Sequence, residues 1–138
     1  MKKYETFEHT ADVGLKIYGK DLKELFINAA LGLFSFITDL KKAESKTEIN
    51  IILKAENQEE LLVSWLNELI FQFSARNFIP KEFKILKIID KEIKAKISGQ
   101  KLDLSKHKIL SEIKAATYHE LEIKKTKNGL EAKVIFDT

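Results

Sequence analysis

The stretch IKAATYHELEIKKTKNGLEAKVIFDT, residues 113–138, decides how this chain completes its fold. Two runs in which polar and apolar residues alternate flank Asn128-Gly129, the dipeptide most typical of a tight β-hairpin turn. A two-residue loop at this dipeptide pairs Lys127 with Leu130 and fixes the register of both strands. The sequence therefore predicts one long C-terminal hairpin.

The predicted register assigns specific neighbours near the end of the chain. Leu121 faces Phe136, an apolar cross-strand pair that supports the register. On the other face of the same strands, Asp137 lies opposite Glu120. Two carboxylates that oppose each other directly repel, so we expect a lysine, water or a bound cation to offset them.

Two amphipathic helices are predicted upstream, in residues 19–39 and 56–80. In both stretches apolar residues recur every three or four positions, which is the helical period. Each helix begins with a polar residue three positions before a glutamate, the spacing of a capping box. These pairs are Asp21 with Glu24 and Asn57 with Glu60.

Short β-branched and aromatic runs predict strands in the rest of the chain. Besides the hairpin, the expected strands are 4–7, 15–18, 48–55, 83–89 and 93–98. Strands and helices do not alternate regularly, which is typical of an α+β protein. We therefore expect one α+β domain over residues 1–138, with a mostly antiparallel sheet, two helices packed on one face and the C-terminal β-hairpin.

Composition excludes several classes of protein. The chain of 138 residues is 44% hydrophobic and 33% charged, with a net charge of +3 and no cysteine, so disulfides and thiolate chemistry are excluded. No apolar run approaches the roughly 18 residues of a membrane span, and the N-terminus does not resemble a signal peptide. We expect a cytoplasmic protein without a membrane partner. Arg76 is the only arginine, which argues against sequence-specific DNA binding.

The acidic residues predict a candidate metal site. Asp12 lies in a turn, HTADVG, between two N-terminal strands. If the last strand pairs with these strands, Asp12 and Asp137 converge, and Thr138 adds a carbonyl or terminal carboxylate oxygen. Such oxygens suit calcium, magnesium or manganese. The alternative is a solvated sheet end with scattered acids.

Other polar residues give weaker indications. His9 is expected to bond the backbone of the turn or to support a metal ligand, and Gly14 to serve a tight backbone conformation. His107, between two lysines, either contacts phosphate or has no role. No hydrolase, zinc-protease or nucleotide-binding motif is present. We therefore expect an accessory protein rather than an enzyme.

Several stretches, in this order, resemble the archease family. They are HTADVG, the helix DLKELFINAALGLF, then WLNELIF, EIKAATYHELEI and the terminal VIFD. The resemblance extends from about Tyr4 to Thr138, which is essentially the whole chain.

The resemblance implies a function that residue spacing does not give. Archeases are protein cofactors of the RtcB-type RNA ligase, which joins tRNA halves in splicing and in RNA repair. They promote guanylylation of the ligase, support multiple turnovers and broaden its nucleotide use. The expected partner is therefore this ligase, with RNA contacted through it. A role proposed elsewhere in the family, as chaperone or specificity modulator of a tRNA methyltransferase, is the alternative.

The resemblance also implies the residues of the site. The family's metal, calcium in known structures, is held by the aspartate of the HTAD turn and by the C-terminal aspartate, with help from the following residue. These positions are Asp12, Asp137 and Thr138. Thr138 stands where the family often has valine or isoleucine, a change that preserves a backbone contact. Lys114 is a further candidate, either for contact with the ligase or its nucleotide or for offsetting the acids.

Overall fold

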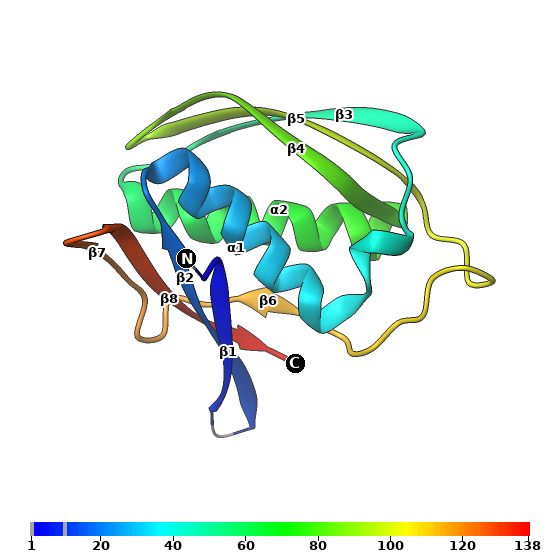
Figure 1. The fold of residues 1–138 in the computed structure, drawn as a ribbon, viewed down its shortest axis with the longest axis horizontal. Coiled ribbons are helices and arrows are strands. Elements are labelled where there is room, and N and C mark those ends of the chain that lie inside the picture. Colours follow the sequence, from blue (N-terminus) through cyan, green and yellow to red (C-terminus); the bar gives the residue numbers. More distant parts are fainter. Residues whose placement is uncertain (1, 10) are drawn as a thin grey trace.

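The computed structural model describes residues 2–9 and 11–138, which form two antiparallel sheets with a pair of helices between them (Figure 1). The first sheet, sheet A, contains β1 (Tyr4–His9), β2 (Asp12–Gly19), β8 (Gly129–Asp137), β6 (Ala115–Ala116) and β7 (Glu122–Thr126). The second, sheet B, contains β3 (Thr47–Lys54), β5 (Glu92–Lys101) and β4 (Phe78–Ile89) in that spatial order. The helices are α1 (Leu22–Ile37), the short 3₁₀ helix η1 (Leu40–Lys42) and α2 (Gln58–Arg76). Among the described residues, no helix is both long and apolar enough to cross a membrane.

The α+β class, the two helices and the C-terminal hairpin are confirmed. The arrangement differs in one respect, because the strands form two sheets where one sheet was expected. Both helices contact both sheets. The reason lies in α1, whose buried residues include the neighbouring pairs Leu25-Phe26 and Leu33-Phe34. A helix that is apolar on more than one side must be covered on more than one side.

The helix boundaries follow the caps read from the sequence. The Asp21 carboxylate accepts a hydrogen bond from the Glu24 amide at 2.9 Å, and the Asn57 side chain accepts one from the Glu60 amide at 2.8 Å. Each bond satisfies one of the amides that a helix N-terminus leaves unpaired. The second helix ends at Arg76 and is followed by the C-cap residue Asn77, whose φ of 56° is left-handed.

The hairpin register is shifted by two residues from the prediction. Lys125 faces Leu130, and Thr126 faces Gly129, so that Lys127 and Asn128 form the turn. Neither turn residue has a positive φ, whereas Gly129 has φ 134°. A side chain at Gly129 would overlap the carbonyl oxygen of Gly19. Gly129 is therefore needed because β8 approaches the end of β2 too closely for a side chain. The predicted type I′ turn was wrong.

The predicted strand of residues 113–127 is also broken. The chain turns between β6 and β7, where Glu120 has φ 54° and the Thr117 hydroxyl donates to the Ile135 carbonyl at 2.9 Å. As a result, Asp137 faces Ala115 rather than Glu120. The predicted opposition of Asp137 and Glu120 was therefore wrong.

Candidate functional site

Two aspartates come together at one end of sheet A, from strands more than a hundred residues apart in the chain. Strand β2 pairs with β8 so that Val13 faces Phe136. The paired register ends there; continued by one residue, it sets Asp12 opposite Asp137. Directly opposed residues project to the same face with Cβ atoms about 5 Å apart. We call Asp12 and Asp137 the acid pair.

A contact at the end of the chain extends this register beyond the acid pair. The Thr138 hydroxyl donates to the carbonyl of Ala11 at 3.4 Å. Ala11 has φ 62°, a left-handed conformation that costs a non-glycine residue of order 1 kcal/mol. The start of β2 is thus linked to the last residue of the chain by this hydrogen bond.

The other two residues predicted for this region are placed by main-chain contacts. The amide of Lys114 donates to the carbonyl of Asp137 at 2.8 Å, and its side chain is exposed. His9 pairs through its main chain with Asp12; its side chain, and all of Thr10, lie outside the described residues. The structure therefore brings Asp12, Asp137, Thr138 and the main chain of Lys114 together.

The acid pair is a set of hard oxygen donors, which fits calcium, magnesium or manganese. It is an incomplete set, because calcium takes 6–8 oxygen ligands. Within residues 2–9 and 11–138, no three histidine, aspartate or glutamate side chains are grouped to hold a metal ion. A cation here would take its remaining ligands from main-chain oxygens, water or a partner.

The hairpin that carries Asp12 is supported on its outer face by Phe7. Phe7 lies opposite Gly14, and a Cβ added to Gly14 would overlap the Phe7 ring. The glycine therefore provides room for this ring; its φ is not positive, which corrects the expected tight turn. The Lys133 ammonium lies 5.5 Å from the centre of the same ring, in a cation–π contact.

Polar contacts at the base of the same hairpin link its two strands. The Tyr18 hydroxyl donates to the Glu5 carboxylate at 3.1 Å, and Lys2 donates to the same oxygen at 3.0 Å. The hydrogen bond from Lys2, with help from Tyr18, lowers the pKa of Glu5. Burial and the contact with Glu5 raise the pKa of Tyr18.

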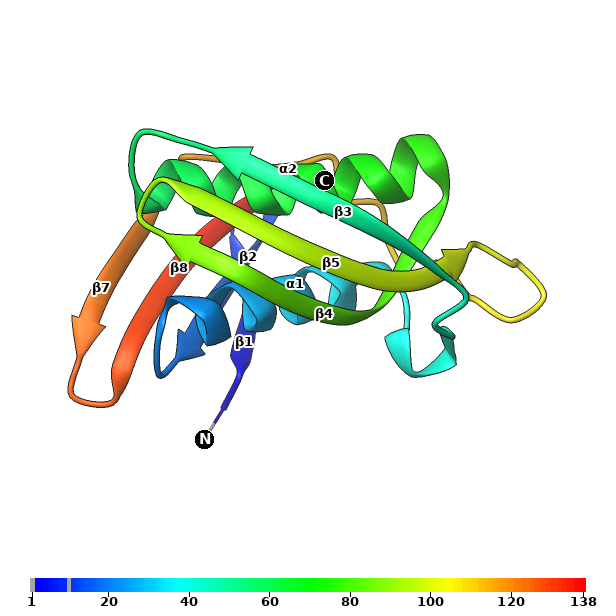
Figure 2. The same ribbon diagram turned by 90° about the horizontal axis from the view of Figure 1, so that it is seen from above.

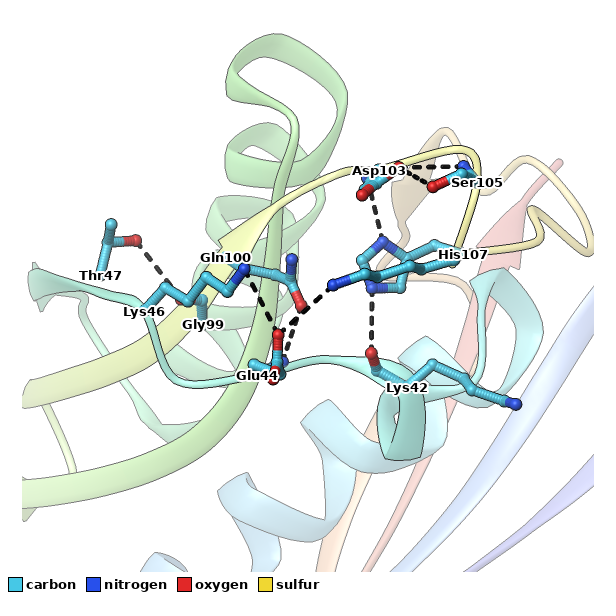
Figure 3. Close-up of polar contacts among 10 residues, drawn as sticks. Lys42, Glu44, Lys46, Thr47, Gly99, Gln100, Asp103, Ser105 and His107 are labelled. Atoms are coloured by element: carbon cyan, nitrogen blue, oxygen red, sulfur yellow. Dashed lines mark hydrogen bonds and ion pairs between the residues drawn. The ribbon is translucent and has the colours of Figure 1, made fainter.

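His107 has a structural role that the sequence did not indicate. Its exposed fraction is 1%. His107 belongs to the segment 102–110 and packs against the segment 40–44 (Figure 3). Its Nδ1 accepts from the Asp103 amide at 3.0 Å, so Nε2 carries the proton and donates to the Lys42 carbonyl at 3.1 Å. The ring is enclosed by protein, so it is not available to a phosphate. Ser105 bonds the Asp103 carboxylate through its hydroxyl and amide, which lowers the pKa of Asp103.

Replacing His107 with alanine should lower the free energy of unfolding by about 2–4 kcal/mol, because two backbone groups lose their partner and a cavity opens. Urea unfolding followed by circular dichroism measures the change. Lys108→Ala, an exposed neighbour, should stay within about 0.5 kcal/mol of the wild type. Equal stability of the two variants would contradict the structural role of His107.

Comparison with known proteins adds to this geometry. The fold defines a class of small α+β proteins in which two antiparallel sheets enclose a pair of helices. Residues 4–138 match the Archease protein family. The chain therefore belongs to the archease family.

Individual relatives cover nearly all of the chain. Protein archease of Methanosarcina mazei is 41% identical over 140 residues, which cover 99% of this chain and 96% of that protein. Protein archease of Pyrococcus furiosus is 38% identical over 133 residues, covering 94% and 93%. The solution structure of Methanobacterium thermoautotrophicum protein 1598 covers 100% of both chains with a TM-score of 0.82 and 33% identity. A Thermotoga maritima crystal structure, described as "an archease, possible chaperone", covers 96% and 94% with a TM-score of 0.68 and 25% identity.

Proposed function

We propose that this protein is an accessory factor of an RtcB-type RNA ligase in tRNA splicing or RNA repair. In this role it promotes guanylylation of the ligase, supports multiple turnovers and broadens nucleotide use, without catalysing a reaction itself. Membership of the archease family supports the proposal. The single structural observation that carries it is the pairing of β2 with β8, whose register, continued by one residue, sets Asp12 opposite Asp137.

The position of the acid pair suits a docking contact. Asp137 is exposed, Asp12 is half-buried, and both lie at the end of sheet A where the β1–β2 turn and the C-terminus emerge. In the proposal, Asp12 and Asp137 hold a divalent cation, Thr138 contributes an oxygen, and water or the partner completes the ligand set. A bound cation would supply positive charge for phosphate oxygens of the ligase's nucleotide. Lys114 lies beside this site and would contact the partner or balance the acids.

The direct test is a ligation assay with the cognate ligase at limiting concentration, with GTP and manganese, with and without this protein. We expect product to exceed one equivalent of ligase only when the protein is present. An equal mass of an unrelated protein is the control for non-specific stabilisation of the ligase. Unchanged product yield and unchanged guanylylation would contradict the proposal.

The alternative function is that of a chaperone or specificity modulator of a tRNA methyltransferase. The description of the Thermotoga maritima relative as a "possible chaperone" favours a chaperone role, whereas the methyltransferase comes from the family resemblance alone. It predicts a different result, in which the protein suppresses aggregation of the methyltransferase and leaves ligase turnover unchanged. Light scattering of the methyltransferase at elevated temperature, with and without the protein, distinguishes this alternative.

A further inference from the structure

The outer face of sheet B carries a cluster of lysines at its centre. Alternation along the three strands directs one set of side chains to the helices and the other to solvent. We define the lysine face by its five lysines, which come from all three strands. They are Lys54, Lys84, Lys87, Lys94 and Lys96. Seen from above, no other described element covers this side of the sheet (Figure 2).

Several of these lysines oppose each other directly. Lys84 faces Lys96, and Lys87 faces Lys94, across the β4–β5 pairing. Like charges directly opposite each other destabilise a sheet. Glu92 lies 2.8 Å from Lys87, and Glu48 lies 3.9 Å from Lys96, at opposite ends of the face.

The remaining lysines of the face form no ion pair with any described residue. These are Lys54, Lys84 and Lys94, of which Lys54, at the end of the face, lies directly opposite Glu92. Lysines on edge strands protect a sheet from aggregation, which accounts for the lysines of the face that lie on the edge strands β3 and β4. Lys94 and Lys96 lie on the central strand β5, where edge protection does not apply.

The high lysine content of the chain does not explain the cluster either. On the outer face of sheet A, Lys124 lies 3.3 Å from Glu131, and Lys133 lies 3.4 Å from Glu120. Lys16 and Lys133 also face each other there, but each has a glutamate opposite it on its other side, Glu5 and Glu122 respectively. On sheet B the acids are displaced to the ends, and positive charge is concentrated at the centre.

We propose that the lysine face binds the phosphate backbone of single-stranded RNA. Alternate residues of one strand, such as Lys94 and Lys96, lie roughly 7 Å apart, comparable with the separation of successive phosphates in an extended strand. Lysine ammoniums contact phosphates as point charges, and the face has neither arginine nor aromatic side chains for reading or stacking bases. The binding is therefore independent of sequence and sensitive to salt.

The choice of RNA as the ligand rests on the proposed function, in which the partner enzyme holds RNA. The helix layer separates sheet B from sheet A, so the lysine face lies on the other side of the molecule from the acid pair (Figure 1). With the acid pair directed at the ligase, the lysine face stays open. It can then retain the part of the RNA that extends beyond the ligase.

The test uses the protein alone with a fluorescent 20-nucleotide RNA, by anisotropy over a series of salt concentrations. We expect weak binding whose logarithm falls linearly with the logarithm of salt concentration. The triple variant Lys84→Gln, Lys94→Gln, Lys96→Gln should bind about tenfold more weakly, with a slope reduced by about 2, since each phosphate contact contributes about 0.7. The matched control, Lys23→Gln, Lys41→Gln, Lys127→Gln, removes the same charge from exposed positions elsewhere and should largely retain both affinity and slope.

Three results would overturn the inference. The first is no binding by the wild type at 50 mM salt, and the second is an equal loss of affinity in the two triple variants. The third is lysine-dependent binding of polyglutamate that is as tight as the binding of RNA, which would indicate an acidic protein partner.

The test is separable from the proposed function, because it contains no ligase. Lysine-dependent RNA binding without ligase stimulation would refute the proposed function alone. Ligase stimulation, together with RNA binding that is unaffected by substitution of the lysine face, would refute this inference alone.

Discussion

A protein carrying Asp137→Ala should fold normally, lose its stabilisation by calcium and no longer stimulate the ligase. Stabilisation by a ligand follows mass action and reaches about 2.7 kcal/mol at a hundredfold excess over Kd, or roughly 10 °C in Tm for a domain of this size. The wild type should show this shift when calcium is added. The variant should not, because one of the two carboxylates across β2 and β8 is gone.

The variant is expected to fold because Asp137 contributes mainly main-chain contacts to the sheet, including the bond from the Lys114 amide. Removing one of two opposed carboxylates also relieves repulsion in the absence of metal. Glu122→Ala, another exposed acid of sheet A, is the matched control and should keep both the calcium shift and ligase stimulation. Full stimulation by a folded Asp137→Ala protein would remove the acid pair from the proposed function.

Trp65→Ala should have the largest effect on stability, lowering the free energy of unfolding by about 4–6 kcal/mol. Trp65 is fully buried on α2 and connects the helix pair with sheet B. Its indole N–H donates to the Phe26 carbonyl at 3.0 Å, and its ring packs against Phe26 and Phe83 with centroids 6.3 Å away in both cases. The loss is a large fraction of the 5–15 kcal/mol typical of a domain.

Urea unfolding followed by far-ultraviolet circular dichroism measures this effect, since the only tryptophan is the one removed. Trp65→Phe keeps an aromatic ring and loses the N–H donor, so it should lower the free energy of unfolding by only about 1–2 kcal/mol. A loss below about 2 kcal/mol for Trp65→Ala would show that the packing of sheet B on the helix pair does not depend on this contact.

Local features of the fold could be predicted from the sequence because they depend on nearby residues. Helix starts at Asp21 and Asn57 are set by bonds to amides three positions away. Periodicity also predicted which residues of β8 face the core, including Phe136. It did not predict the number of sheets, since it identifies an apolar face without identifying what covers it.

The register of the hairpin shows a second limit. A shift by two residues leaves every side chain on the same face, so alternation cannot distinguish the predicted register from the observed one. Asn128-Gly129 suggested a type I′ turn, but the close approach of Gly129 to Gly19 decided where the glycine lies. His107 illustrates the same limit: a histidine between lysines in a polar stretch gave no sign that it would be buried.

The sequence by itself determined the helices and their caps, the faces of the strands, and the resemblance that implied the site residues. Only the tertiary structure decided that β2 pairs with β8, which directs Asp12 toward Asp137, that Glu120 lies elsewhere, and that lysines gather at the centre of sheet B. The physical reason is that these juxtapositions depend on pairing between strands distant in sequence. Residue periodicity carries information about burial, and it carries none about which distant strand becomes the neighbour.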